Sequence, residues 1–312
     1  MLIGRRKFAI TAACGLASLA ISQGCSRKTK EEVIDIHQHL NYVNRSNPDF
    51  ISHQERMGVT RSVLLPAGSY LNVESTHFGE SNGLAANISV TQSAYELTQE
   101  HPDKFVYFCC EVPDTDGAID TMETWLNKGA VGIGEMKFNI DCDSEPMIRV
   151  YELANEYQVP VLIHFQHGMY NHGFERFHKI LTRFPKVNFI GHAQTWWGNI
   201  DAKHEQEVMY PTGPVTAGGL TDRYLSDYPN MYGDLSAGSG KNALDRDPEH
   251  AVAFLERHQD KLCLGTDCPD IEGEGETCKG SGQIENVRKY ASNPVILEKI
   301  FSKNTRRIIQ IA

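Results

Sequence analysis

Two histidines separated by one residue, His37 and His39, are the clearest candidates for chemistry in this chain of 312 residues. They end the run of residues 33–40, in which apolar and polar side chains alternate as they do along a strand. Side chains at positions i and i+2 of a strand point to the same face, so the two imidazoles would converge on one point, as the first two ligands of a metal ion do. Two unrelated histidines would explain an isolated pair equally well.

Further strand-like runs also end in a residue that can bind a metal or move a proton. These residues are Glu135 and Lys137, His164, His192, Asp234 and Asp267. Imidazole and carboxylate ligands together suit Zn, Fe, Mn or Ni, and three or four protein ligands leave a position open for catalysis. Each residue alone could be a core side chain, a helix cap or half of an ion pair. Because all of them follow successive runs, they predict a metal site.

The elements that must position these residues alternate between strand-like and helical segments. Eight short β-rich runs occur, at Val33–His39, Arg61–Pro66, Phe105–Val112, Ala130–Phe138, Val159–Phe165, Val187–His192, Met231–Leu235 and Leu262–Asp267. Most are continuously apolar, which is typical of strands buried on both faces of a parallel sheet. Helical spacing or caps mark Ala86–Glu100, Ala118–Asn127, Ser144–Tyr157, Phe174–Arg183, Leu220–Ser226, Pro248–Arg257, Val295–Ser302 and Thr305–Ile311.

This order predicts an α/β fold, a single (β/α)8 TIM barrel with the metal site at the C-terminal ends of its strands. An open doubly wound sheet is the alternative, but that fold usually has a glycine-rich turn after its first strand, where this chain has His-Gln-His. Two long connections, residues 194–218 and 268–283, would lie over the same end of the barrel and shape a pocket.

Three residues near these loops are candidate substrate contacts. Trp196 and Trp197 lie at the start of the first long connection and could stack on a sugar or an aromatic ring, or pack the loop instead. His167 follows the fifth strand-like run closely enough to contact a substrate or to support a ligand.

The first residues indicate that the protein is exported and do not belong to the predicted barrel. Residues 1–25 combine Arg5 and Arg6 with an apolar stretch that is short for a membrane span, the layout of a twin-arginine export signal. Gly24 before Cys25 resembles a lipoprotein cleavage site, with Cys25 lipidated; a plain signal peptide or an uncleaved anchor are the alternatives. We therefore expect residues 26–31 to be a tether and residues 32–312 to be the barrel. The protein would be periplasmic or anchored on the outer side of the cytoplasmic membrane.

Charge and cysteine usage narrow the classes of partner. The chain has 40 acidic and 30 basic residues, a net charge of −10, and this disfavours a nucleic-acid partner. Of eight cysteines, Cys109, Cys110 and Cys263 lie in apolar runs and are predicted to be buried free thiols. Cys268 and Cys278 flank a glycine-rich loop and are either free or joined by a disulfide.

The motifs together resemble a known family. Residues 35–39 (DIHQH), 160–164 (PVLIH), 189–192 (FIGH) and 265–267 (GTD), followed by Asn304, are similar in kind and order to the amidohydrolase superfamily. The resemblance covers residues 32–312 and is to the amidohydrolase-related branch, which holds aminocarboxymuconate-semialdehyde decarboxylase-like enzymes and lactonases. It implies a metal-dependent enzyme but specifies no substrate.

Carried over by position, the resemblance implies that His37, His39, His164 and Asp267 bind one divalent metal. Zn is the first expectation for that metal, with Mn or Fe as alternatives. His192 would polarise water or substrate, and Asp267 would also take a proton.

Glu135 resembles the glutamate that bridges two metals in TatD-type hydrolases. It is therefore an additional candidate ligand, and either one or two ions would fit. One ion is favoured because the sequence from Lys137 to the helix at Ser144 resembles the mononuclear branch. Lys137 would anchor an anionic group of the substrate.

Three functions follow from this resemblance. The first is a metal-dependent hydrolase that attacks a small cyclic ester or amide, or a related C–O or C–N bond, with a metal-activated water. The second is a metal-dependent nonoxidative carboxy-lyase, which would use the same ligands. The third is a noncatalytic barrel that binds a small molecule.

Overall fold

The computed structural model describes residues 31–68, 74–75, 79–80 and 88–311. The predicted export signal and tether, residues 1–30, lie outside this part of the chain. Eight parallel strands form the centre, namely β1 (Ile34–Gln38), β2 (Arg61–Leu64), β5 (Phe105–Tyr107), β6 (Ile133–Met136), β7 (Val161–His164), β8 (Phe189–His192), β9 (Met231–Asp234) and β10 (Leu262–Cys263). Each lies within one of the eight predicted runs. Two short antiparallel strands, β3 (Glu74–Ser75) and β4 (Gly79–Glu80), pair separately.

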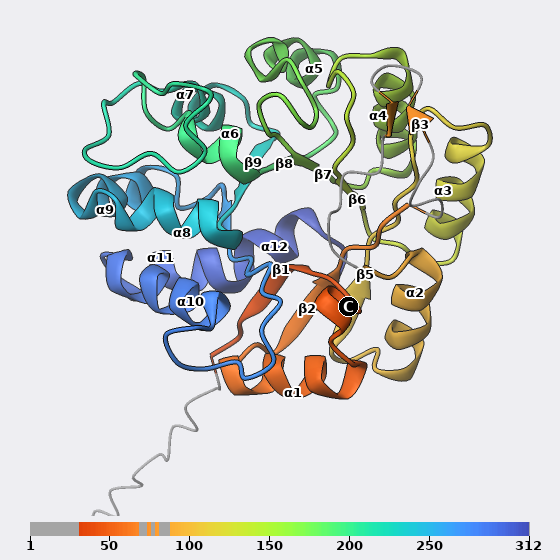
Figure 1. Ribbon diagram of the computed structural model, residues 1–312, viewed down its shortest axis with the longest axis horizontal. Helices are drawn as coiled ribbons and strands as arrows, with labels where there is room; N and C mark the ends of the chain where they lie inside the picture. The colour runs from red at the N-terminus through yellow and green to blue at the C-terminus, as the bar shows by residue number, and fades with distance from the viewer. Residues whose placement is uncertain (1–30, 69–73, 76–78, 81–87, 312) are drawn as a thin grey trace, which may run out of the picture. The chain divides into compact units, whose positions relative to one another are not determined.

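Backbone hydrogen bonds join the central strands into a barrel. One sheet has the order β1-β2-β5 and the other the order β10-β9-β8-β7-β6. At one junction the Gly134 amide donates to the Cys109 carbonyl at 2.9 Å, and at the other the Ile36 amide donates to the Leu264 carbonyl at 2.9 Å. Because both edges are bonded in this way, the predicted (β/α)8 TIM barrel is confirmed. Figure 1 shows the helices arranged around the strands in chain order.

The helices surround the strands, and the last of them also contributes Ile308 to the apolar cluster inside the barrel. They are α1 (Asn47–Met57), α2 (Thr91–Glu100), α3 (Ala118–Asn127), α4 (Glu145–Tyr157), α5 (His178–Arg183), α6 (Ala193–Gly198), α7 (Leu220–Asp227), α8 (Ala237–Asp245), α9 (Pro248–Arg257), α10 (Lys279–Tyr290), α11 (Pro294–Glu298) and α12 (Asn304–Ile308). Short turns of other helix types occupy Tyr42–Asn44, Phe174–Arg176 and Lys299–Lys303. The sequence did not predict α1, α6, α8 and α10, and the helix predicted from residue 86 begins at Thr91.

Local capping explains why several helices begin and end where they do. The Asp247 carboxylate accepts a hydrogen bond from the His250 amide at the start of α9, as its position before Pro248 indicated. Ser46 caps α1 in the same way, and α1 ends at Gly58, whose φ of 79° favours glycine. The signals for α1 were therefore present in the sequence.

The barrel interior is a separate apolar cluster with the site directly above it. Its buried members from the strands and their extensions are Ile36, Val63, Leu65, Phe108, Leu162, Ile190, Tyr232 and Cys263. Residues two apart on a strand share a face, so the strands that bury Leu162, Ile190 and Tyr232 also direct the residues two positions later into the barrel. Those residues are His164, His192 and Asp234. The apolar residues inside the barrel thus set the direction of these three side chains of the site.

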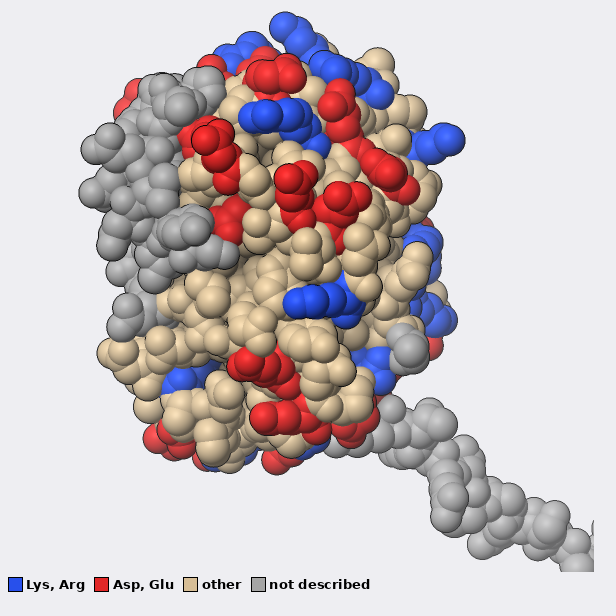
Figure 2. Space-filling model, turned by 90° about the vertical axis from the view of Figure 1, so that its right-hand side faces the viewer, with Lys and Arg blue, Asp and Glu red and all other residues tan. Residues whose placement is uncertain are grey.

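Figure 2 draws one face of the molecule, the side at the right of Figure 1. Lys and Arg side chains on this face are scattered among Asp and Glu side chains and form no continuous stripe. Within the part of the chain that the structure describes, no helix is both long and apolar enough to cross a membrane.

Candidate metal centre

Four ligand atoms converge at the C-terminal ends of the strands. They are His37 Nε2 and His39 Nε2 from β1 and the turn after it, Glu135 Oε2 from β6, and Asp267 Oδ1 from the segment after β10. The two imidazole nitrogens are 3.1 Å apart. Glu135 Oε2 lies 3.6 Å from His37 and 3.4 Å from His39, and Asp267 Oδ1 lies 3.9 Å and 3.5 Å from the same nitrogens. We call these four residues the barrel cluster.

The hydrogen bonds on the far side of each ring show what the converging atoms offer. His37 Nδ1 lies 2.7 Å from Asp234 Oδ2, and His39 Nδ1 lies 2.7 Å from the carbonyl oxygen of Leu65. Both partners only accept, so each neutral ring carries its proton on Nδ1 and turns a lone pair on Nε2 toward the cluster. Two lone pairs and two carboxylate oxygens therefore face one another, an arrangement that a cation between them stabilises.

The spacing of the barrel cluster fits a divalent metal. Ligands at about 2.0–2.1 Å from a tetrahedral metal lie about 3.3–3.4 Å from each other, and the five separations given above range from 3.1 Å to 3.9 Å. Two groups of three could each hold an ion, namely His37, His39 and Asp267, and His37, Glu135 and His192. Asp267 Oδ1 is buried without a hydrogen-bond partner in the described part of the chain. The structure thus brings together three of the predicted ligands, His37, His39 and Asp267, and places Glu135, the additional candidate, beside the two histidines.

His164, a further predicted ligand, lies beside Glu135. Its Nδ1 lies 2.6 Å from Glu135 Oε1, and its Nε2 lies 2.9 Å from Gln166 Oε1. A neutral ring has one N–H, so a proton on Nδ1 that is donated to Glu135 leaves the lone pair of Nε2 available. His164 therefore orients the Glu135 carboxylate and remains a candidate ligand beside the barrel cluster. Burial, and then the charge of Lys137, lowers the pKa of His164 to about 4, so this ring is neutral near pH 7.

Asp234 supports two site histidines at once. Its Oδ2 accepts from His37 Nδ1 and from Ser236 Oγ, each at 2.7 Å, and lies 3.2 Å from His192 Nδ1. Burial acts to raise the pKa of Asp234, but His37 and His192 outweigh it and lower the pKa, so the carboxylate stays charged. The strand-end position of Asp234 was visible in the sequence, whereas its partners were not.

His192 faces the barrel cluster from β8. Its Nε2 lies 3.6 Å from Glu135 Oε1 and 4.0 Å from Asp267 Oδ2, while Ser236 Oγ lies 2.9 Å from its Nδ1. The ring is 1 % exposed. It is therefore close enough to exchange a proton with a group at the centre.

The charges of the barrel cluster also favour a cation. Burial acts to lower the pKa of His37, but the carboxylates of Asp267, Asp234 and Glu135 outweigh it and hold the pKa well above its usual value. Burial raises the pKa of Glu135, yet His37 and His164 bring it well below its usual value. The carboxylates that attract a proton to His37 would attract a metal ion to the same place.

Close packing brings the segment after β10 against the first strand. A Cβ at Gly265 would lie 2.0 Å from Asp234 Oδ1, so only glycine fits there. Asp35 Oδ1 accepts from the amides of Thr266 and His37 at 2.9 Å and 3.1 Å. Burial raises the pKa of Asp35 to about 6. These contacts, which the sequence did not reveal, hold Asp267 beside the two β1 histidines.

Comparison with known proteins agrees with this arrangement. The model of the amidohydrolase family matches residues 34–311. This chain belongs to the amidohydrolase family. No curated protein sequence matches this chain at a significant level.

Solved structures share the fold of this amidohydrolase at low sequence identity. The 2,6-dihydroxybenzoate decarboxylase of Rhizobium is 12 % identical, with a TM-score of 0.55 over 89 % of this chain and 98 % of that one. A probable 2-pyrone-4,6-dicarboxylic acid hydrolase of Acinetobacter baumannii with bound citric acid is 14 % identical, with a TM-score of 0.54 over 89 % and 98 %. A dihydroxybenzoic acid decarboxylase of Polaromonas with bound manganese and 2-nitroresorcinol is 12 % identical, with a TM-score of 0.56 over 89 % and 96 %.

A small polar cavity of about 210 Å³ opens beside the barrel cluster of this amidohydrolase. His164, His192 and Asp267 form its inner wall. Lys137 and Lys279 also line it, as do Tyr42 and Tyr210, so the predicted contact Lys137 does lie at the site. Tyr42 and Lys279 had no distinguishing signal in the sequence, because neither lies at a strand end. Tyr42 begins a short turn after β1, and Lys279 begins α10.

The two tryptophans lie in the core. Trp196 and Trp197 are 0 % and 2 % exposed, and Trp197 Nε1 donates to the Asp234 carbonyl at 3.0 Å. An indole with no exposed face cannot stack on a ligand, so the structure matches the packing alternative, not the substrate contact. The physical reason is that α6 follows β8 directly and turns both rings inward.

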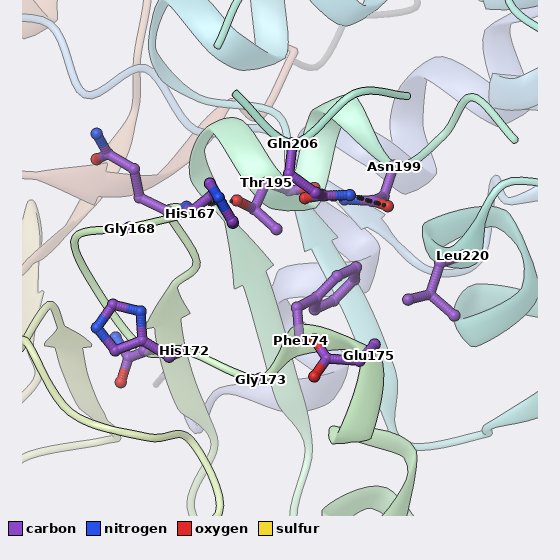
Figure 3. Close-up of a pocket in the computed structure, with 12 residues that line it drawn as sticks. His167, Gly168, His172, Gly173, Phe174, Glu175, Thr195, Asn199, Gln206 and Leu220 are labelled. Atoms are coloured by element: carbon purple, nitrogen blue, oxygen red, sulfur yellow. Dashed lines mark hydrogen bonds between the residues drawn. The ribbon is translucent and has the colours of Figure 1, made fainter. Parts of the chain in front are cut away.

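His167 lines a different cavity, of about 490 Å³, next to the first. Figure 3 shows His167 and Thr195 on one side of it, with Phe174 and Leu220 nearby. Gln166 lines both cavities, so they lie on either side of this residue. His167 is therefore close to the site but outside the cavity that reaches the barrel cluster.

Proposed function

We propose that this amidohydrolase is a metal-dependent hydrolase of a small, negatively charged ester or amide, such as a lactone that carries a carboxylate. The observation that carries the proposal is the barrel cluster, in which Asp267 Oδ1 has no hydrogen-bond partner in the described part of the chain and borders a small polar cavity. A divalent metal held by His37, His39, Glu135 and Asp267 would polarise a carbonyl group and lower the pKa of water.

Asp267 and His192 would move the protons of the reaction. The Asp267 side chain is 14 % exposed, so it reaches the cavity and can accept a proton from the attacking water. His192 presents Nε2 to the same space while Asp234 and Ser236 hold its Nδ1 side. This ring can therefore take up a proton and return it to the leaving group.

The cavity supports the substrate class. A volume of about 210 Å³ is below that of pockets for drug-sized ligands, which are about 300–1,000 Å³. Two side chains with ammonium groups, Lys137 and Lys279, line the cavity together with Asp267 of the barrel cluster. A compact molecule with a carboxylate at one end and an ester or amide carbonyl at the other would fit this cavity. Its carboxylate would bind the lysines, and its carbonyl group would face the barrel cluster.

A nonoxidative carboxy-lyase is the second candidate. It is favoured by the similarity in fold to two structures described as dihydroxybenzoate or dihydroxybenzoic acid decarboxylases. The lysines could hold the carboxylate of an aromatic acid while Asp267 manages the proton that replaces it. The two candidates differ in product, since one releases carbon dioxide and the other opens an ester or amide.

The test begins with the metal content of the purified full-length protein and of a His37→Ala, His39→Ala double variant. Loss of one equivalent of metal in the variant is expected. The metal-loaded protein is then offered carboxylated lactones, amides and dihydroxybenzoates, with acid release and carbon dioxide measured separately. Acid release supports the hydrolase and carbon dioxide the lyase. Absence of both, with metal bound, would favour the noncatalytic barrel.

Lys137 provides a sharper test of the substrate class. Lys137→Met should raise KM for a carboxylated substrate about tenfold or more, because one charge-assisted contact is lost, and should change kcat much less. Lys186→Met, at an exposed position in the turn before β8, is the matched control. An equal KM in both variants would contradict the anchoring role.

We also propose that residues 1–25 export the protein and that Cys25 carries a lipid. The twin arginines and the cysteine after Gly24 support this. Cys25→Ser should move the protein from the membrane fraction to the soluble exported fraction. An unchanged distribution would contradict the lipid anchor.

A further inference from the structure

A second group of metal-binding side chains lies outside the barrel cluster. His53 in α1, Cys268 and Asp270 after β10, and Cys278 at the N-terminus of α10 offer ligand atoms that all lie within 4.8 Å of one another. His53, Cys268 and Cys278 are 0 %, 0 % and 1 % exposed, and Asp270 is half-buried. We call these four residues the thiol cluster.

We propose that the thiol cluster is a structural zinc site. Its donor set, two thiolates, one imidazole and one carboxylate, is of the kind that closes a four-coordinate zinc site. For Zn–S of about 2.3 Å and tetrahedral angles, the two sulfurs should lie about 3.8 Å apart and a sulfur and an imidazole nitrogen about 3.6 Å apart. Cys268 Sγ lies 3.7 Å from Cys278 Sγ, and Cys278 Sγ lies 3.7 Å from His53 Nε2.

The surroundings balance the charge that such a site would carry. Two thiolates and one carboxylate bring three negative charges, and Zn²⁺ with one guanidinium brings three positive charges. Arg45, which is 2 % exposed, supplies the guanidinium and donates from Nη1 to the carbonyls of Cys268 and Asp270 at 2.9 Å and 2.6 Å. A buried charged group needs such compensation.

Both a thiolate and a zinc-bound imidazole find hydrogen-bond partners here. Cys278 Sγ accepts from the Ser281 amide at 3.4 Å in the first turn of α10, a position that favours the thiolate. Zinc on His53 Nε2 requires a proton on Nδ1, and the Gln54 side-chain amide lies 3.2 Å from Nδ1. Arg45 Nη1, which only donates, lies 3.4 Å from the same nitrogen. Gln54 would therefore accept that proton after turning its oxygen to this side.

The thiol cluster joins parts of the chain that carry the barrel cluster. Cys268 directly follows Asp267, and His53 belongs to the helix after β1, which carries His37. A zinc ion bound by His53 and Cys268 would cross-link these two segments and so hold the backbone of Asp267 in place. It would also keep the two cysteines, both free thiols in the structure, from forming a disulfide.

The test uses full-length protein with His37→Ala and His39→Ala, which empties the barrel cluster. After growth with added zinc, this variant should retain about one equivalent of zinc. Replacing zinc with Co²⁺ should produce the near-ultraviolet thiolate-to-cobalt band. Adding Cys278→Ser to the double variant should abolish both the bound zinc and this band. Cys142→Ser, at a buried cysteine elsewhere, is the matched control and should keep the metal and the band.

The outcomes separate this site from the proposed function. If the wild-type protein binds no more zinc than the double variant, the barrel cluster holds no zinc. That result contradicts the proposed function and leaves the thiol cluster unaffected. A double variant without zinc, or a mass lower by two hydrogens that shows a disulfide, overturns the thiol cluster. If Cys278→Ser does not fold, X-ray absorption of the double variant decides, because sulfur at about 2.3 Å from zinc supports the site and its absence refutes it.

Discussion

Replacing Asp234 with Asn tests whether the carboxylate behind the histidines sets metal affinity. Asp234→Asn keeps the shape of the side chain but removes a buried charge 2.7 Å from His37 Nδ1 and 3.2 Å from His192 Nδ1. Loss of a carboxylate that orients a metal-binding histidine typically weakens metal binding about 10–100-fold, or about 1.4–2.7 kcal/mol. Because Asp234 supports two histidines and is fully buried, we expect the upper end of this range.

The assay is a competition for zinc between the purified protein and a chromophoric chelator. Asp222→Asn is the matched control, since Asp222 is also a paired aspartate but contacts Arg257 and His258 on the outer helices. This control should leave the dissociation constant unchanged. If Asp234→Asn binds zinc within about twofold of the wild type, the hydrogen-bonded carboxylate does not tune the barrel cluster and the proton assignment for His37 is wrong.

Three further changes probe neighbouring features. Gly265→Ala should weaken zinc binding at least tenfold in the same assay, because the added Cβ would lie 2.0 Å from Asp234 Oδ1. Unchanged binding would show that the segment after β10 can shift without disturbing the barrel cluster. Trp196→Phe should lower the free energy of unfolding by about 1–3 kcal/mol and leave KM unchanged, since the ring only packs the core; a raised KM at unchanged stability would restore the stacking role. Burial raises the pKa of Asp222, but its bonds to His258 and the neighbouring arginine outweigh this and lower it below 3.8. Its stabilising contribution is therefore complete above about pH 4 and disappears as the pH falls further, so Asp222→Asn should flatten acid unfolding curves recorded with chelator, and a parallel curve would contradict this.

The order of elements and the identity of most site residues could be predicted from local sequence patterns. Apolar runs of strand length with a polar residue at the end place His37, His39, His192 and Asp267 at one edge of a parallel sheet. This works because each pattern depends only on neighbours in the chain. Helices such as α6 and α8 escaped prediction because at most two residues separate them from the preceding strand, so no turn signal marks where they begin.

The sequence by itself determined the barrel and the end of it where chemistry gathers. Only the tertiary structure showed that Glu135 lies between His39 and His164, that Trp196 faces the core, and that Cys268 and Cys278 meet His53. The physical reason is that strand and helix periods specify a face and an end, whereas the distance between two side chains on different strands depends on barrel closure and on the packing of every residue between them.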